Sequence, residues 1–333
     1  MHTTNPNDHE WPARNPAARM KHSRGPSARR VARCTAALGG IAAAILVLAG
    51  CTSVASNSGI SDSPASTENS TTAGAVSTAA ALATASWGSN VTVTIADGML
   101  RYVSDGIPNH PRQKEYALPA AGGAVPTAAT AVAQADPTRS QSYDFKITTT
   151  PVLADSPTPA SLGTIGVMIS GAALFNPYEG DGTTVAIASN FTVPGSDGKP
   201  VAFLDSCNGH PNPMGAYHYH GLPTCVTATV DKEGGPSHII GVAFDGFPIY
   251  GDRDITGAVI PASRLDQCNG ITSETPEFPE GIYHYVLLDV ADSTSSIKCF
   301  SGVVDPSLTK AAGQMPGMGG GAGPGMDGVK PAP

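Results

Sequence analysis

The sequence predicts a mainly β fold, built as a single β-rich domain with long loops and an internal D-x-C-N-G/Y-H-Y repeat. Three observations lead to this prediction. Short segments rich in β-branched and aromatic residues recur along the chain. The 38 glycines and 29 prolines place turn signals between these segments. Few segments repeat their apolar residues at the period of about 3.6 that is typical of an amphipathic helix.

The first 50 residues have the pattern of a secretion signal. Basic residues precede an apolar run at residues 35–48, which is shorter than the about 20 residues that a membrane-spanning helix needs. The run ends in Leu48-Ala49-Gly50-Cys51, which resembles the lipobox of bacterial lipoproteins. The resemblance implies cleavage before Cys51, acylation of its thiol, and a lipid-anchored protein on the extracytoplasmic face of the cell membrane. The alternative is a short transmembrane anchor with an incidental Cys51, and the export route, general or twin-arginine, stays open.

Charge excludes some classes of partner. The chain has 19 basic and 27 acidic residues, of which seven and two lie in residues 1–50, so residues 51–333 carry 12 and 25, a net charge of −13. A chain this acidic is a poor candidate for nucleic acid or for anionic lipid head groups, and it suits cations better. We therefore expect membrane contact through the acylated Cys51 and no nucleic-acid partner, while nothing in the sequence points to a protein partner.

Composition divides the rest of the chain into three parts. Residues 51–86 are rich in Ser, Thr and Ala and predict a flexible tether behind the lipidated cysteine. Residues 87–310 form the predicted domain, and the Gly-, Pro- and Met-rich residues 311–333 predict a disordered tail. Within the domain, the clearest strand signals lie at residues 91–95, 143–148, 163–170, 226–230, 239–244 and 282–288.

Four cysteines follow Cys51, namely Cys207, Cys225, Cys268 and Cys299. An even number in an exported protein indicates disulfide bonds, although four cysteines allow three pairings. No C-x-x-C spacing is present, which makes a zinc–thiolate site the weaker interpretation. The repeat favours closing each copy on itself, Cys207 with Cys225 and Cys268 with Cys299, and cross-pairing between the copies stays open.

The repeat begins with D-x-C-N-G at residues 205–209 and again at 266–270. Each copy continues through G-x-Y-H-Y, at residues 215–219 and 281–285, to one more cysteine. The copies differ in their histidines. His210 and His220 of the first copy are Ile271 and Val286 in the second, so the second copy keeps only His284. A purely structural repeat offers no reason for this asymmetry.

The first copy predicts a metal site. In a strand, alternate residues share a face, so His218 and His220 point one way and the flanking tyrosines the other. His210 is close enough in sequence to supply a third ligand, and Asp205 and Asp245 are acidic candidates. Neutral imidazole suits Zn, Cu, Fe and Ni, and we expect Cu, Zn or Fe here. The alternative is that the rings stack and hydrogen-bond within a polar, aromatic core.

These residues resemble the YHYH domain family, named for the tetrad at residues 217–220. Similar motifs occur at residues 107–110, 209–215, 244–251 and 299–302, so the resemblance spans about residues 88–302. The resemblance implies export, often with a signal or a lipid anchor. It also implies that six side chains form one cluster in space, although it does not specify the function of the cluster. These are His110, His210, His218, His220, Asp245 and His284. The second tetrad departs from the pattern at Val286, and Asp245 is equally consistent with a ligand, a general base or a turn residue.

Three functions are consistent with these observations. The first is a metal-binding lipoprotein. The second is a zinc-dependent hydrolase of cell-wall or carbohydrate material, but zinc endopeptidases of peptidoglycan need an Asp four residues after their upstream histidine, where this chain has Lys114. The third is a structural or interaction domain without metal. No nucleophile elbow, Walker loop or dinucleotide fingerprint is present, and no catalytic residue is predicted.

Overall fold

The computed structural model describes residues 77–120 and 125–313. All of them belong to one compact unit, Asn69–Pro333. Outside the described residues lie the predicted signal peptide, the predicted lipidation site Cys51 and most of the predicted tether and tail. Within the described part of the chain, no helix combines the length and the apolar character needed to cross a membrane.

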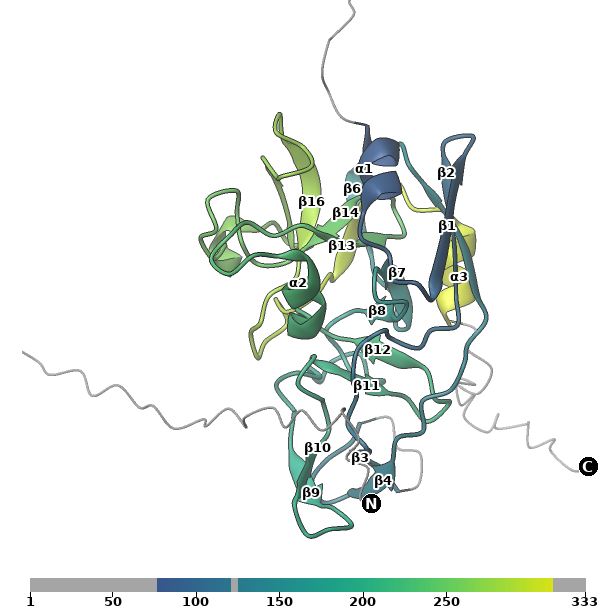
Figure 1. The fold of residues 1–333 in the computed structure, drawn as a ribbon, viewed down its shortest axis with the longest axis vertical. Coiled ribbons are helices and arrows are strands. Elements are labelled where there is room, and N and C mark those ends of the chain that lie inside the picture. Colours follow the sequence, from purple (N-terminus) through teal and green to yellow (C-terminus); the bar gives the residue numbers. More distant parts are fainter. Residues whose placement is uncertain (1–76, 121–124, 314–333) are drawn as a thin grey trace, which may run out of the picture. The chain divides into compact units, whose positions relative to one another are not determined.

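The fold is mainly β, as predicted, and its largest element is an eight-stranded sheet of order β11-β12-β8-β7-β13-β14-β16-β15 (Figure 1). Its strands are β7 (Thr164–Met168), β8 (Ala173–Phe175), β11 (Gly209–Pro211), β12 (Tyr217–Tyr219), β13 (Ile239–Ala243), β14 (Pro248–Tyr250), β15 (Gly270–Ser273) and β16 (Ile282–Val286). The two central strands, β7 and β13, pair antiparallel, and every residue of both is buried. Their apolar runs do not alternate, because both faces of this part of the sheet are covered.

Close packing of the central pair depends on glycine. A side chain at Gly241 would place its Cβ 2.5 Å from the carbonyl oxygen of Val167 on the neighbouring strand. No larger residue fits there without moving the backbone.

The two hairpins β11-β12 and β15-β16 lie at opposite ends of the sheet. Strand β12 runs parallel to β8, and β16 runs parallel to β14 in the same way. The D-x-C-N-G loops that lead into them make the same hydrogen bonds. Asp205 Oδ1 accepts from the backbone N–H groups of Cys207 and Gly209, and Asp266 Oδ1 accepts from those of Cys268 and Gly270.

The asparagines of these two loops have the left-handed backbone, with φ of 58° at Asn208 and 66° at Asn269. Asparagine tolerates this conformation better than most residues do. The cysteines pair as predicted, Cys207 with Cys225 and Cys268 with Cys299, with Cα–Cα distances of 5.3 Å and 4.8 Å.

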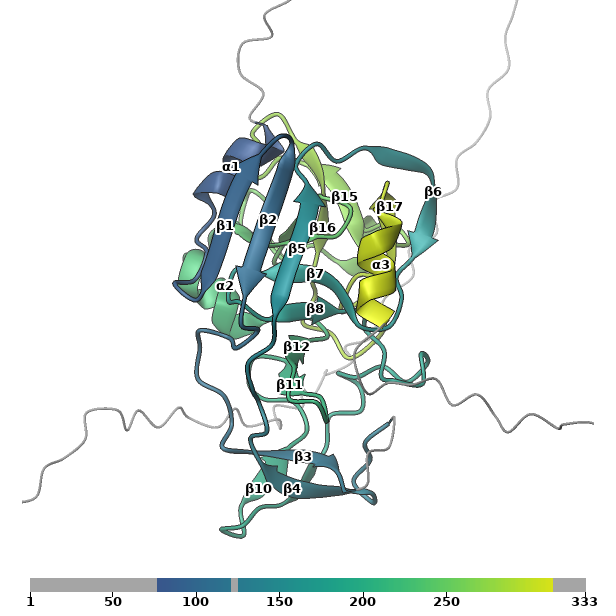
Figure 2. The same cartoon turned by 90° about the vertical axis from the view of Figure 1, so that its right-hand side faces the viewer.

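Four smaller sheets make up the rest of the β structure in the described part of the chain. A three-stranded antiparallel sheet packs over the centre of the large sheet (Figure 2), where Tyr102 donates to the carbonyl of Met168 and Phe145 packs against Phe244 with ring centroids 5.0 Å apart. Its order is β1-β2-β5, and the remaining pairs are β3-β4, β9-β10 and β6-β17. These strands are β1 (Val91–Ala96), β2 (Met99–Ser104), β3 (Glu115–Pro119), β4 (Ala131–Ala135), β5 (Tyr143–Thr148), β6 (Leu153–Pro159), β9 (Thr192–Pro194), β10 (Pro200–Ala202) and β17 (Cys299–Gly302).

The described residues form three α-helices and one 3-10 helix: α1 (Thr78–Thr84), α2 (Thr224–Val230), α3 (Pro306–Gly313) and η1 (Ala262–Arg264). The strand predicted at residues 226–230 is wrong, because these residues belong to helix α2. Its β-branched residues favour a strand by propensity, but Cys225 is tied to Cys207, and only Val226 of this segment is buried. A strand preference is realised only where a neighbouring strand offers packing and hydrogen bonds, so tertiary context overrides it here.

Helix α1 lies inside the segment predicted as tether. Ser77 caps it by accepting a hydrogen bond from the backbone N–H of Ala80, and Leu82 is completely buried. One buried leucine and small alanines thus attach a Ser/Thr/Ala-rich segment to the core. At the other end, α3 continues three residues beyond the predicted end of the domain at residue 310.

Candidate metal centre

Three histidines meet at one end of the large sheet. His210 on β11 lies opposite His218 on β12, and His220 follows β12 directly. The strand alternation predicted for the Y-H-Y-H segment is present, because His218 and His220 share a face with ring centroids 4.8 Å apart. Ligand-capable atoms of all three lie within 4.8 Å of one another, and the Nε2 atoms of His210 and His220 are 3.2 Å apart.

Backbone carbonyls orient two of the rings. His218 Nδ1 lies 3.0 Å from the carbonyl oxygen of Ala216, and His220 Nδ1 lies 2.7 Å from that of Asn176. A carbonyl only accepts, so both Nδ1 atoms carry the proton and both neutral rings present the Nε2 lone pair. Metal-bound histidines are held in the same way, with the second ring nitrogen donating to a carbonyl or carboxylate.

His210 is left with an unsatisfied atom. Its Nδ1 is buried and has no hydrogen-bond partner among the described residues. If His210 Nε2 carries the proton, it donates to His220, and the Nδ1 lone pair is buried alone. If Nδ1 carries the proton, that donor is unpaired and two Nε2 lone pairs face each other at 3.2 Å. A cation between the rings removes this repulsion, so the donor set fits a metal ion.

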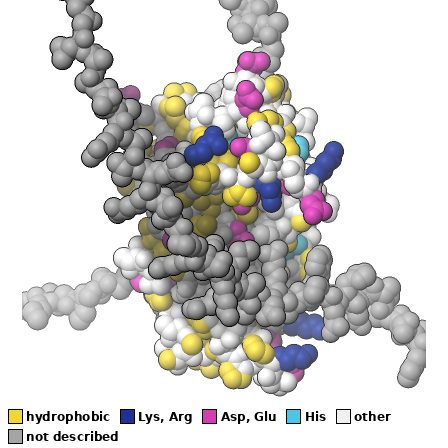
Figure 3. Space-filling view, turned by 90° about the vertical axis from the view of Figure 1, so that its left-hand side faces the viewer, with side chains coloured by type: hydrophobic (Ala, Val, Ile, Leu, Met, Phe, Trp, Pro, Cys, Tyr) yellow, Lys and Arg dark blue, Asp and Glu magenta, His cyan; other side chains and the backbone are white. Residues whose placement is uncertain are grey.

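The site is enclosed and uncharged. The exposed fractions of His210, His218 and His220 are 6%, 3% and 2%. Phe175 stacks on His218 with ring centroids 3.9 Å apart, and Phe203 packs on His210 at 4.2 Å. On the face drawn in Figure 3, histidine accordingly colours only small patches of the visible surface.

Burial keeps these rings neutral. It lowers the pKa of His210 and His218 well below the usual 6.5, and repulsion from the neighbouring imidazoles adds to the effect. Burial also lowers the pKa of His220 to about 4. At neutral pH all three rings are therefore in the form that binds transition metals.

His110 lies on the opposite face of β12, away from this centre. Its Nε2 is 2.6 Å from the hydroxyl of Tyr219 and 3.4 Å from the sulfur of Cys207. On the same face, the carboxylate of Asp205 accepts hydrogen bonds from the hydroxyls of Tyr116 and Tyr217, each at 2.8 Å. His110, Cys207 and Cys225 lie close enough to share an ion. Both cysteines are paired in a disulfide, and so they are not thiolate ligands.

His284 and Asp245 belong to the other half of the sheet. Strands β8, β7, β13 and β14 lie between β12 and β16, which carries His284. Its ring repeats the orientation of His218, with Nδ1 3.0 Å from the carbonyl of Ile282, and packs edge-on against Tyr250. Ile271 and Val286 stand where the first hairpin has His210 and His220.

Asp245 is a structural acceptor inside this half. It is completely buried and accepts hydrogen bonds from the Tyr285 hydroxyl at 2.5 Å and the Gly302 N–H at 2.9 Å. Burial raises its pKa to about 6. The single cluster of six side chains expected from the family resemblance therefore does not form. The structure brings three histidines together. His110 is separated from them because it lies on the opposite face of β12, and Asp245 and His284 are separated because the two hairpins lie at opposite ends of the sheet.

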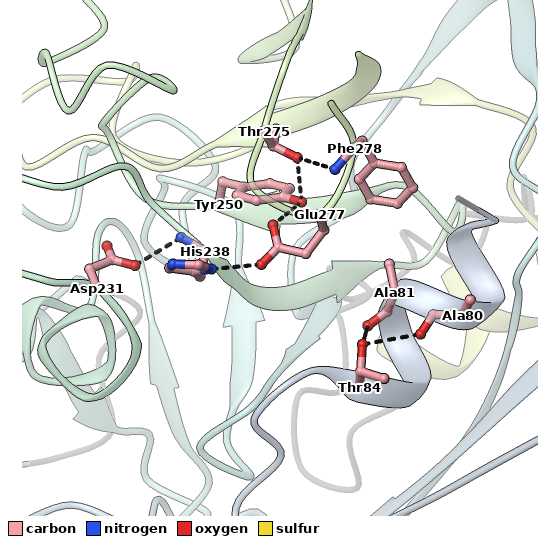
Figure 4. Close-up of polar contacts among 9 residues, drawn as sticks. All are labelled: Ala80, Ala81, Thr84, Asp231, His238, Tyr250, Thr275, Glu277 and Phe278. Atoms are coloured by element: carbon pink, nitrogen blue, oxygen red, sulfur yellow. Dashed lines mark hydrogen bonds and ion pairs between the residues drawn. The ribbon is translucent and has the colours of Figure 1, made fainter. Parts of the chain in front are cut away.

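The sequence patterns did not reveal a hydrogen-bonded cluster of His238, Glu277 and Tyr250, which lies outside the three-histidine centre and is drawn in Figure 4. His238 Nδ1 lies 2.8 Å from Glu277 Oε1, and the Tyr250 hydroxyl donates to Glu277 Oε2 at 2.9 Å. The pair borders a cavity of about 240 Å³ whose other wall includes Ala81 and Thr84 of α1. His238 and Glu277 are 39 residues apart, so no local motif signals their contact.

Sequence reasoning also missed the two carbonyls and the two phenylalanines that hold the histidine rings. Asn176, Phe175 and Phe203 precede the motif residues, and Ala216 is the variable residue of G-x-Y-H-Y. Their side chains or backbone carry no ligand signal of their own, so only proximity in the fold identifies them.

Comparison with known proteins supports the assignment of the domain. The family described as YHYH protein matches residues 144–259 and 255–302. No curated protein and no solved structure matches the chain. The matched segment contains all eight strands of the large sheet and the three clustered histidines, whereas His110 precedes it. Residues 144–302 of this chain are therefore a YHYH domain.

Proposed function

We propose that this protein is a lipoprotein, anchored through Cys51 outside the cytoplasmic membrane, whose YHYH domain binds one transition-metal ion. The ligands are the Nε2 atoms of His210, His218 and His220. The observation that carries the proposal is the convergence of three buried, neutral imidazoles, two of them oriented by backbone carbonyls.

Binding explains this geometry better than a structural role does. When His210 carries its proton on Nδ1, the Nε2 lone pairs of His210 and His220 face each other at 3.2 Å, and an ion held by the Nε2 atoms replaces this repulsion with coordination. The second hairpin has the same backbone pairing with Ile271 and Val286 in place of the two histidines. A strand pair of this kind therefore does not need three rings for its stability.

Binding also fits better than hydrolysis of a polymer. A catalytic zinc site keeps one coordination position open to water and substrate. Here the three side chains are at most 6% exposed, and Phe175 and Phe203 cover two of the rings. A cell-wall polymer has no access to an ion held at this depth.

The proposed location rests on the N-terminal signal pattern and on the disulfides. The basic and apolar segments before Cys51 predict export and lipidation. Two disulfide pairs agree with that prediction, because such bonds persist outside the cytoplasm and are rare inside it.

Elemental analysis of the full chain, purified without a His tag, tests metal binding. We expect about one transition-metal ion per chain. In the double variant His210→Ile/His220→Val we expect none, because two of the three ligands are removed. These substitutions introduce the residues that the second hairpin carries at the same places, so we expect the variant to fold.

The matched control is His284→Ala, which removes a buried histidine of the same orientation outside the centre. We expect it to retain the ion. Negligible metal in the unsubstituted chain, even after incubation with Cu, Zn and Fe salts, would contradict the proposal. Equal metal content in the unsubstituted chain and a folded double variant would also contradict it.

A further inference from the structure

We infer that the ion selected by this centre is monovalent copper, Cu(I), rather than a divalent ion. The inference rests on the proposed function, since it concerns the same three ligands. It is based on the balance between the charge of the ion and the charge of its ligands. The ligand type alone does not select one metal. Imidazole binds copper, zinc, iron and nickel alike.

The described residues supply no negative ligand to this centre. The metal-capable group contains His210, His218 and His220 and no carboxylate or thiolate. Asp205 accepts from Tyr116 and Tyr217 on the other face of β12. The two hydrogen bonds that orient the rings go to backbone carbonyls, which carry no net charge. The full charge of a bound ion therefore stays in the site.

An uncompensated charge is costly in a buried position. The cost of transferring an ion from water to a low-dielectric interior rises with the square of its charge, so a divalent ion costs about four times as much as a monovalent ion of equal size. The exposed fractions of the three rings, 2–6%, and the covering rings of Phe175 and Phe203 keep water from screening the charge. Charge balance therefore favours Cu(I) over Zn(II), Co(II) and Cu(II).

The number of ligands leads to the same choice. Each of the three histidines offers one ligand nitrogen to a shared ion. For His218 and His220 this is Nε2, because a backbone carbonyl holds Nδ1. Cu(I) has a filled d shell and is satisfied by two or three nitrogen ligands. A three-histidine zinc site needs water as its fourth ligand, and that water needs hydrogen-bond partners of its own. Here aromatic rings, which offer no such partners, lie against His210 and His218.

Anaerobic titration of the full chain tests the inference. Cu(I) is added in competition with a colorimetric Cu(I) chelator, and Zn(II), Co(II) and Cu(II) are titrated separately against chelators of known affinity. We expect one Cu(I) per chain, bound tighter than Zn(II) or Co(II) by roughly two orders of magnitude or more. X-ray absorption of the copper complex should show three nitrogen ligands and no sulfur ligand.

The variants locate the bound ion. His210→Ile/His220→Val should lose the tight Cu(I), whereas His284→Ala should keep it. Cu(I) that both proteins hold equally is bound outside the three histidines, for example by the methionines of residues 311–333, which are unchanged in the double variant, and this result overturns the inference.

The remaining outcomes separate the two proposals. If Zn(II), Co(II) or Cu(II) binds the three histidines as tightly as Cu(I) or tighter, this inference is wrong and the proposed metal-binding function stands. If none of the four ions binds in a way that depends on His210 and His220, this inference is wrong, and if Fe(II) does not bind in that way either, the proposed function is wrong too.

Discussion

A buried glutamate outside the metal centre makes a sharp prediction about stability. Glu179 is 5% exposed, and its Oε1 has no hydrogen-bond partner among the described residues. Burial raises its pKa from 4.5 to about 8, and repulsion from Asp181 adds to the shift. At pH 7 the folded chain therefore holds a proton at Glu179 that the unfolded chain releases.

The magnitude follows from linkage. Because the pKa is raised in the folded state, the contribution of Glu179 to stability is fully present below pH 4.5 and is lost as the pH rises toward 8. Between pH 4.5 and pH 7 the loss is 2.5 pH units at about 1.36 kcal/mol each, or about 3 kcal/mol. Glu179→Gln keeps the size of the side chain and cannot ionise. We compare the free energy of unfolding of the variant with that of the unsubstituted chain at each pH. Between pH 4 and pH 7 this difference should shift by about 3 kcal/mol in favour of the variant.

Urea unfolding of both proteins between pH 4 and pH 8 measures this difference. Taking the difference between variant and unsubstituted chain removes the contributions of Asp245 and other titrating groups. Glu233→Gln, at an exposed glutamate, is the matched control and should show no such trend. The prediction is refuted if the stability difference shifts the other way, so that the variant loses stability relative to the unsubstituted chain between pH 4 and pH 7. That result would show that the charged carboxylate is required in the fold.

Two further predictions concern the disulfides and Tyr217. Replacing each disulfide by two alanines should lower the free energy of unfolding by about 3 kcal/mol for Cys207–Cys225 and about 4 kcal/mol for Cys268–Cys299, which close loops of 18 and 31 residues. Losses below about 1 kcal/mol in urea unfolding would contradict the loop-closure explanation. Tyr217→Phe removes a hydrogen bond to the buried Asp205 and should cost about 2 kcal/mol. A loss below about 0.5 kcal/mol in thermal unfolding would show that this bond contributes little to stability.

Local sequence patterns were sufficient for part of this structure. The strand signals at residues 143–148, 239–244 and 282–288 are confirmed by β5, β13 and β16. The H-x-H spacing placed His218 and His220 on one face, because strand alternation depends only on neighbouring residues. The order of the motifs in the two copies favoured the cysteine pairing that the structure has, although the paired cysteines are 18 residues apart in one copy and 31 in the other.

The order of strands in the large sheet determines which candidate residues lie near one another, and local sequence patterns do not reveal that order. Only the fold shows that β11 and β15 lie at opposite ends of eight strands, which separates His284 and Asp245 from the centre. It also brings Asn176, Phe175 and Phe203 to the histidine rings and turns residues 224–230 into a helix. These features depend on pairings between segments far apart in the chain, and no local propensity encodes such pairings.

The sequence by itself therefore determined the β character and favoured both the disulfide pairs and histidine as the candidate ligand, since these depend on residue type and on the order of short motifs. The tertiary structure alone decided that three of the six histidine and aspartate candidates meet, and that they meet without a carboxylate in a nearly closed site. The number and charge of the ligands around an ion are properties of the packed sheet, because burial and contact are fixed only when distant strands pair.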